Sequence, residues 1–195
     1  MAGDSSEDDG IAATALATIR TAVAGRESRT LQSFVAGTSI GRYVLHKRLG
    51  AGAMGVVWSA RDPKLDRDVA IKLVHPELAR SEHAATRLLR EARAMAKLSH
   101  RSVITVHDAG DVDGQLWLAM ELVRGTTLGH LLRSRAAAAI GDWPHWLAMT
   151  LDAGRGLAEA HRNGVLHRDF KPDNVMVDPA GRVCVGDFGL AMLGD

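Results

Sequence analysis

Short runs of apolar residues separated by polar turns dominate the chain from Gly41 to about residue 123. Such runs, rich in β-branched residues, predict five strands, at residues 43–45, 56–60, 69–74, 103–106 and 116–122. Asp113-Gly114 predicts a tight turn between the last two strands. A helix is predicted from Ser81 to Leu98, because apolar residues recur there at helical spacing. We therefore expect a strand-rich lobe with one helix.

After residue 123, apolar residues recur mainly at helical spacing. Thr127 is expected to cap a short helix that ends at Arg135, and a long helix is predicted from about Trp143 to Asn163. Asp142 is the expected cap of the long helix, Pro144 lies in its first turn, and Gly164 suits the position after its end. Two glycines inside it, Gly154 and Gly156, cost about 1 kcal/mol each relative to alanine. Either they permit close packing or the helix is shorter. Short strands are predicted at 165–166, 175–177 and 183–185.

The first 40 residues differ from the rest of the chain in composition and in hydrophobic periodicity. The first ten carry four acidic residues and no basic residue, and residues 11–36 are rich in alanine and threonine with weak periodicity. We expect residues 1–40 to be a flexible, disordered leader. This acidic start does not resemble a secretory signal, and no run of 18 apolar residues predicts a membrane segment in this chain.

Composition narrows the function classes further. The 195 residues are 46% hydrophobic and 24% charged, which is typical of a soluble globular protein. A net charge of +1 gives no basic surface for nucleic acid, so we expect no nucleic-acid partner. The single cysteine, Cys184, excludes a disulfide or a cysteine-rich zinc site within the chain, and a reducing, cytoplasmic location is expected.

The first candidate motif is the glycine cluster from Gly50 to Val57, which matches G-x-G-x-x-G-x-V. Glycines allow a backbone turn to approach anionic oxygens and to point free N–H groups at phosphate. Glycine-rich hairpins are common, so the motif alone is weak. A dinucleotide-binding loop needs a helix directly after it, whereas residues 56–58 favour a strand. A Walker A loop is excluded because no Gly-Lys-Ser/Thr follows.

A lysine and a glutamate follow the glycine cluster. Lys72 lies in the apolar strand run 69–74, where its ammonium group can reach phosphate, although a surface lysine is the commoner reason for such a residue. Glu91, on the predicted helix, can hold the Lys72 head in place. Alternatively, Glu91 is a solvated helix charge paired with Arg87 or Lys97.

Two polar segments complete the set. His167-Arg168-Asp169-Phe170-Lys171-Pro172-Asp173-Asn174 places a carboxylate and a carboxamide close together, which suits a proton acceptor and a metal ligand. Asp187-Phe188-Gly189 places a carboxylate after the strand 183–185, where it can bind a hard cation, although Asp-x-Gly turns are common.

Together these four segments occur in the order and spacing of the protein-kinase signature. The region Gly41–Asp195 resembles the eukaryotic-like (Hanks-type) serine/threonine protein kinases of bacteria. Lys171, two residues after Asp169, is typical of serine/threonine rather than tyrosine kinases. The resemblance implies an α+β, protein-kinase-like bilobal fold. Its N-terminal lobe, about residues 41–123, would be complete, with a five-stranded antiparallel sheet and one helix; its helical C-terminal lobe, about 124–195, would be incomplete.

The resemblance also implies ATP and Mg²⁺ as cofactors and proteins bearing Ser/Thr hydroxyls as substrates. It implies that Lys72 holds the α- and β-phosphates and pairs with Glu91, while Gly50, Gly52 and Gly55 cover the phosphates. Asp169 would accept or orient the proton of the substrate hydroxyl, and Lys171 would contact the γ-phosphate. The Mg²⁺ ligands would be Asn174 and Asp187.

For the adenine ring, the resemblance implies a sandwich of apolar side chains and a hinge. The sandwich would consist of Leu49, Val57, Ala70 and Met176. Met120 matches the gatekeeper position, and the backbones of Glu121 and Val123 would contact the adenine edge. A hydrophobic spine between the lobes would consist of Met95, Val106, His167 and Phe188. Cys184 is expected to be inert, because no neighbouring base lowers its pKa.

The resemblance covers only part of a kinase, since the activation segment and several later helices have no counterpart before Asp195. We therefore expect a truncated form, with a complementary C-lobe chain as a candidate partner. The apolar side of the helix Trp143–Asn163 is expected to pack on helices that the chain lacks. Two functions stay open: an ATP-dependent serine/threonine protein kinase, favoured by the intact motifs, and a non-catalytic ATP-binding or interaction fragment, favoured by the length.

Overall fold

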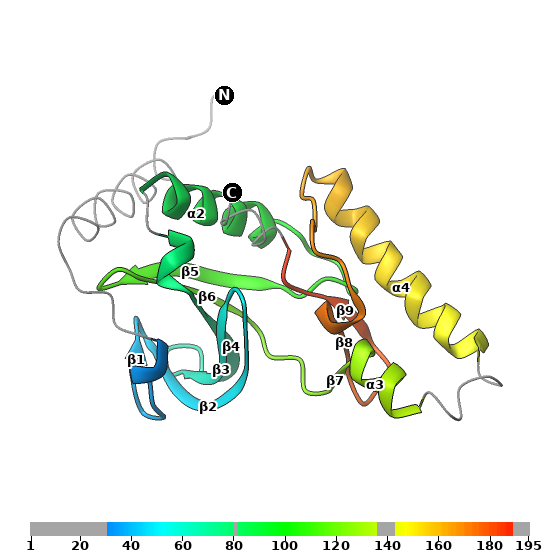
Figure 1. Cartoon of the computed structure of the whole chain (residues 1–195), viewed down its shortest axis with the longest axis horizontal. Coiled ribbons are helices and arrows are strands. Elements are labelled where there is room, and N and C mark those ends of the chain that lie inside the picture. The colour runs from blue at the N-terminus through cyan, green and yellow to red at the C-terminus, as the bar shows by residue number, and fades with distance from the viewer. Residues whose placement is uncertain (1–30, 80–81, 136–142, 189–195) are drawn as a thin grey trace, which may run out of the picture.

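The structure is a computed structural model that describes residues 31–79, 82–135 and 143–188, in two lobes (Figure 1). The first lobe contains η1 (Leu31–Ser33), β1 (Ser39–Ile40), β2 (Tyr43–Gly52), β3 (Gly55–Asp62), β4 (Arg67–Val74), η2 (Pro76–Ala79), α2 (Glu82–Ala96), β5 (Val106–Val112) and β6 (Gln115–Glu121). The second lobe contains β7 (Thr126–Thr127), α3 (Leu128–Arg135), α4 (Trp143–Arg162), η4 (Pro172–Asn174), β8 (Val175–Val177) and β9 (Val183–Val185). The predicted caps Ser81 and Asp142 lie outside the described residues.

The sheet of the N-terminal lobe has the order β1-β2-β3-β4-β6-β5, and its neighbouring strands are antiparallel. Four of the five predicted strands lie in β2, β3, β4 and β6. The prediction of a strand at 103–106 was wrong, because β5 begins at Val106 and continues through residues that lack apolar alternation. Pairing with β6 holds this stretch extended despite its composition. The predicted turn is confirmed, with positive φ of 54° at Asp113 and 80° at Gly114.

The boundary predicted at residue 41 was also wrong for the residues just before it. Leu31, Phe34 and Ile40 are buried and belong to the same hydrophobic cluster as Tyr43. Ser39 and Ile40 add β1, a sixth strand, to the edge of the sheet. The burial of three large apolar side chains favours an ordered segment over a flexible one. The rest of the expected leader, residues 1–30, lies outside the described residues.

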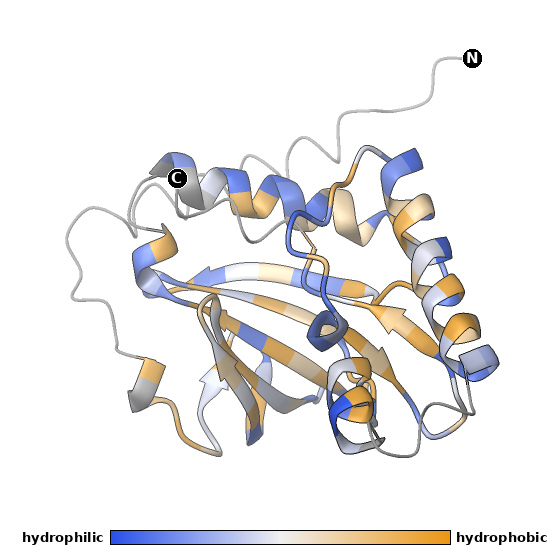
Figure 2. Cartoon of the chain, turned by 45° about the vertical axis from the view of Figure 1, so that its right-hand side comes forward, coloured by the Kyte–Doolittle hydropathy of each residue, from blue (hydrophilic) through white to orange (hydrophobic). Residues whose placement is uncertain are grey.

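The two faces of the sheet bury alternate residues, as strand geometry requires. One face packs Val69, Ile71 and Leu73 into a cluster with Trp117 and Ala119. The opposite face is covered by α2, and the shared cluster contains Val74, Leu88, Leu89, Ala92, Leu116 and Leu118. Figure 2 shows hydrophobic residues concentrated along these strands. The central strand β4 is therefore buried on both faces, and this burial surrounds Lys72 with apolar groups.

The predicted helices of the C-terminal lobe are confirmed. Thr127 Oγ1 accepts a hydrogen bond from His130 N at 3.1 Å and so caps α3. Gly164 follows α4 with a φ of 73°. Gly156 permits close packing, since a Cβ there would lie 2.3 Å from Ser102 O, whereas Gly154 faces open space. The prediction of a strand at 165–166 was wrong, because Val165 packs into the core instead of pairing.

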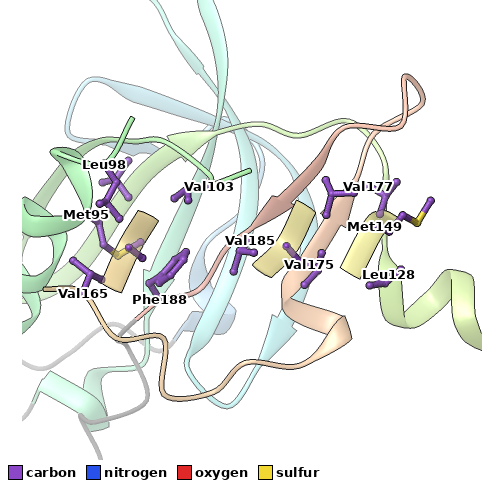
Figure 3. Close-up of a cluster of buried hydrophobic side chains, with 14 residues drawn as sticks. Met95, Leu98, Val103, Leu128, Met149, Val165, Val175, Val177, Val185 and Phe188 are labelled. Atoms are coloured by element: carbon purple, nitrogen blue, oxygen red, sulfur yellow. The ribbon is translucent and has the colours of Figure 1, made fainter. Parts of the chain in front are cut away.

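The core of the C-terminal lobe joins α2 to the small β7-β8-β9 sheet and to α4. Figure 3 shows Met95 and Leu98 near Phe188, with Val175 and Val185 next in line and Met149 and Leu128 beyond them. Met149 is therefore buried within this chain, while Leu147 and Leu151 of the same helix are 46% and 51% exposed, as expected for a helix with an unpacked apolar side. Within the described residues, no helix is both long and apolar enough to cross a membrane.

Candidate active site

The segment between Val165 and β8 is organised around His167, which is 3% exposed. Its Nε2 lies 2.7 Å from Gly186 O, and its Nδ1 lies 3.4 Å from Asp169 N. Burial lowers the pKa of His167, so the ring is neutral near pH 7, with Nε2–H donating to Gly186 and Nδ1 accepting from Asp169. The ring also contacts Phe188, with centroids 4.7 Å apart. His167 thus joins the loop that carries Asp169 to the strand end that carries Asp187.

Asp169 is held by two neighbours on its own loop. Lys171 Nζ donates to Asp169 Oδ2 at 2.7 Å, and Asn174 Nδ2 donates to Asp169 O at 2.8 Å and to Oδ2 at 3.3 Å. The hydrogen bond from Lys171 is the main cause that lowers the pKa of Asp169, so this carboxylate is ionised at neutral pH. Asn174 uses Nδ2 in both bonds, which leaves its Oδ1 available to a cation.

Lys72 and Asp187 meet between the lobes. Lys72 lies on β4 with its side chain 3% exposed, and its Nζ donates to Asp187 Oδ1 at 2.8 Å. Asp187 follows β9 with a φ of 57°, a left-handed conformation in which its carboxylate faces the N-terminal lobe. Met54 Sδ, in the turn of the glycine loop, lies 3.9 Å from Lys72 Nζ. Three of the four predicted motifs therefore come together at this one ammonium group.

The predicted pair between Lys72 and Glu91 was wrong for this structure. Glu91 Oε1 accepts a hydrogen bond from Arg168 Nη1 at 3.1 Å and lies 3.8 Å from Arg87 Nε. The alternative prediction, that Glu91 pairs with Arg87 four residues earlier on α2, is therefore confirmed. Arg168 is a second partner of Glu91, and the sequence did not predict it. Lys72 pairs instead with Asp187, which lies two residues after the end of β9.

The glycine loop is the turn between β2 and β3, where Gly52 pairs with Gly55 and Gly50 pairs with Val57. A Cβ on Gly50 or Gly52 would meet nothing within 4 Å, so the loop leaves open space there. Gly55 differs, because it has a φ of 145° and a Cβ on it would lie 1.9 Å from Leu73 O. A glycine is therefore required at position 55 by the neighbouring strand, independently of any ligand.

The side chains expected around adenine lie on β2, β3, β4 and β6 of the N-terminal lobe and on β8 of the C-terminal lobe. Ala70 and Met120 are directly opposite each other on β4 and β6, and Val57 is opposite Lys72. Leu49 is 49% exposed, and Met176 is half-buried in β8. Glu121 ends β6, and residues 122–124, which include Val123, have no regular secondary structure. The expected spine residues Met95, Val106 and Phe188 share one cluster, and His167 contacts Phe188.

Two further ion pairs around the site were missed by sequence reasoning. Arg133 of α3 binds Asp173 with an Nη2–Oδ1 distance of 2.8 Å, and Arg182, just before β9, binds Glu121. No local signal marks these partners, because 40 and 61 residues separate them. Cys184 is buried, and burial raises the pKa of its thiol to about 11, in line with the expected lack of reactivity. Gly189 lies outside the described residues.

Comparison with known proteins gives consistent results. Residues 43–194 match the family described as protein kinase domain. A probable serine/threonine-protein kinase, pknA2 of Bifidobacterium longum, is 38% identical over 77% of this chain and 20% of its own length. The serine/threonine-protein kinase PknA of Mycobacterium tuberculosis is 38% identical over 79% of this chain and 36% of its own length. The Mycobacterium tuberculosis PknI kinase domain superposes with a TM-score of 0.73 and 32% identity, over 81% of this chain and 64% of that chain. The chain therefore spans well under half of these curated relatives.

Proposed function

Since this chain belongs to the protein kinase family, we propose that it binds ATP with Mg²⁺ between its lobes and transfers the γ-phosphoryl group to Ser/Thr hydroxyls of proteins. The main support is the convergence of Lys72, Asp187 and the Asp169–Asn174 loop at the lobe junction. The names of the relatives support the serine/threonine class. A cytoplasmic setting is part of the proposal and is supported by the single, buried thiol of Cys184.

The donor groups fit such a ligand. Asp187 and Asn174 offer a carboxylate oxygen and an amide oxygen, the hard ligands that Mg²⁺ prefers. The open space over Gly50 and Gly52 leaves room for phosphate oxygens near the loop backbone. When bound, Mg²⁺–ATP supplies the phosphoryl group, and the metal neutralises the charge that develops during transfer. Lys72 would hold phosphate oxygens with its ammonium group, which has three N–H donors and gives one of them to Asp187.

Asp169 is the proposed acceptor for the hydroxyl proton. In the balanced step, the substrate oxygen forms a bond to the γ-phosphorus, the bond from that phosphorus to the bridging oxygen breaks, and ADP leaves. The hydroxyl proton passes to the Asp169 carboxylate, which Lys171 keeps ionised. Lys171 would then be close enough to share a γ-phosphate oxygen. Asn174 and His167 would position Asp169 through its backbone and carboxylate.

A second candidate function is nucleotide binding without transfer. It is favoured by one observation, namely that Lys72 pairs with Asp187 while Glu91 pairs with Arg168. In this arrangement Lys72 donates a hydrogen bond to Asp187, the proposed metal ligand. Transfer in protein kinases needs the lysine–glutamate pair, so a chain that keeps Glu91 on Arg168 would bind nucleotide without transferring phosphate.

Titration of the purified chain with ATP, with and without Mg²⁺, tests the proposal. Lys72→Ala and Asp187→Ala should each weaken binding at least tenfold, since each removes a charge that faces phosphate or metal. Lys64→Ala, at an exposed turn, is the matched control and should bind like the parent. If Lys72→Ala and Asp187→Ala also bind like the parent, the site is wrong.

Phosphotransfer to a generic protein substrate separates the two candidates. Asp169→Asn should lower the transfer rate about a hundredfold or more with little change in ATP affinity, because Asp169 faces the hydroxyl. A parent chain that binds Mg²⁺–ATP but transfers nothing supports the second candidate. A parent chain that binds no nucleotide contradicts both.

A further inference from the structure

The turn between β8 and β9 is a rigid loop built by Asp178. Its Oδ1 accepts hydrogen bonds from Ala180 N and from Arg182 N, each at 2.9 Å. Its backbone N donates to Arg182 O at 3.0 Å, and Gly181 supplies the positive φ of 81° that the turn needs. Such a loop fixes the backbone from which the Arg182 side chain reaches across to another element, so pairing orders the side chain without ordering any more backbone.

The guanidinium group of Arg182 lies between two carboxylates. Its Nη2 binds Glu121 Oε1 at the end of β6, and its Nε lies 3.5 Å from Asp178 Oδ2. The side chains of Arg182 and Glu121 are only 30% and 26% exposed, so the pair is partly shielded from solvent. Arg182 belongs to the C-terminal lobe and Glu121 to the N-terminal lobe. The ion pair therefore links the lobes beside the segment that connects them.

The connecting segment, residues 121–125, is fixed at both ends against the β8–β9 hairpin. At its first end, Glu121 pairs with Arg182, and Glu121 N donates to Thr105 O at 2.9 Å. At its last end, Gly125 lies so close to β8 that a Cβ would be 2.1 Å from Val177 O. Residues 122–124 have no regular secondary structure. Between the two ends, Arg124 Nη2 donates to Asp68 Oδ2 of β4 at 2.6 Å, but its side chain is 74% exposed, so this pair contributes less than a shielded one.

We infer that Arg182 is a positioning residue for nucleotide binding: by pairing with Glu121 it holds the segment 121–125 in the conformation that meets the adenine edge. The inference rests on the proposed function, which places adenine against the backbone of this segment. A segment that is already ordered loses less conformational entropy when a ligand binds, and this raises affinity. Arg182 touches neither phosphate nor metal in this scheme, so it should affect affinity more than the rate of transfer.

The test compares Arg182→Ala with the parent in two measurements on the whole chain. The dissociation constant for Mg²⁺–ATP should rise about threefold to fivefold, the size expected for a partly shielded ion pair. Hydrogen exchange of the amides at 121–124 should become faster without nucleotide, because the pair no longer holds the segment. Arg182→Lys should recover part of both effects. Arg155→Ala, which removes an arginine paired with Asp152 on α4, is the matched control and should change neither.

A double variant shows whether the effect passes through Glu121. Glu121→Gln should weaken ATP binding about as much as Arg182→Ala, and the combination should be no weaker than either alone. Additive losses, unchanged hydrogen exchange in Arg182→Ala, or tighter ATP binding in that variant would each overturn the inference. If the parent binds Mg²⁺–ATP and Arg182→Ala binds it equally well, the inference fails while the proposed function stands. If the parent binds none, the proposed function fails with it.

Discussion

Gly156 offers a sharp test of how α4 supports the candidate site. A methyl group at this position would lie 2.3 Å from Ser102 O, whereas ordinary contact begins at 3.4 Å. Relief of this overlap requires a shift of about 1 Å, which a packed core resists. The same carbonyl accepts the hydrogen bond from Val185 N at 2.9 Å. Because Val185 lies two residues before Asp187, Gly156→Ala should disturb the strand that positions a proposed metal ligand.

Three contributions set the expected magnitude. Overpacking costs about 1–3 kcal/mol. A weakened hydrogen bond between Val185 and Ser102 costs about 0.5–1.5 kcal/mol. Replacement of glycine by alanine inside a helix returns about 1 kcal/mol. We expect Gly156→Ala to lower the free energy of unfolding by about 0.5–3.5 kcal/mol. Gly154, two residues earlier, is exposed, and a Cβ at this position would meet nothing within 4 Å. Gly154→Ala should therefore raise the free energy of unfolding by up to about 1 kcal/mol.

Urea unfolding followed by circular dichroism measures both variants against the parent. A second measurement, the affinity for Mg²⁺–ATP, should decrease in Gly156→Ala and stay unchanged in Gly154→Ala. Equal stabilisation by the two substitutions would refute the reasoning, because it would mean that α4 does not approach Ser102 closely. A loss of stability in Gly156→Ala with normal nucleotide affinity would refute the link from α4 to Asp187.

Three further predictions concern single side chains. Because burial raises the pKa of Cys184 to about 11, iodoacetamide at pH 7 should modify the native chain much more slowly than the urea-unfolded chain, and equal rates would contradict its burial. Met149→Ala should lower the free energy of unfolding by about 2–5 kcal/mol, and Leu147→Ala by less than about 1 kcal/mol, since only Met149 is buried; similar losses would refute this assignment. Burial lowers the pKa of His167, so the unfolded state binds more protons as the pH falls below about 6.5. The free energy of unfolding should therefore decrease from pH 7 to pH 5, and it should decrease less steeply in His167→Asn. An unchanged pH dependence in His167→Asn would contradict this prediction. His107→Gln is measured alongside, because burial also lowers the pKa of His107.

The features that sequence predicted well depend on local chemistry. The cap at Thr127, the glycine after α4 and the Asp113-Gly114 turn each need only neighbouring residues to form. Apolar periodicity likewise located α2 and α4, because one side of each helix packs against the core. Side-chain types in the motifs then identified which loops carry carboxylates and amides, and the structure brings those loops together.

The features that sequence missed depend on distant partners. Ser39 and Ile40 form a strand only because β2 lies beside them, and residues 107–112 are extended because β6 pairs with them. Their own composition favours neither state strongly. The leader boundary failed for the same reason, since the burial of Leu31 and Phe34 follows from a surface that β2 and β3 provide.

Charge partners were the least predictable part of the site, and the reason is physical. Lys72 has two possible carboxylates, Glu91 and Asp187, and Glu91 has two possible cations, Lys72 and Arg168. An ion pair near a lobe junction contributes little net free energy, because desolvation offsets most of the attraction. Small changes in the position of α2 or in the charge of a ligand therefore decide between the pairings. A polyanionic ligand near Lys72 would compete with Asp187 for the ammonium group of Lys72. The motifs therefore predict which groups meet at this site, whereas the choice among partners of similar free energy depends on packing that the sequence does not display.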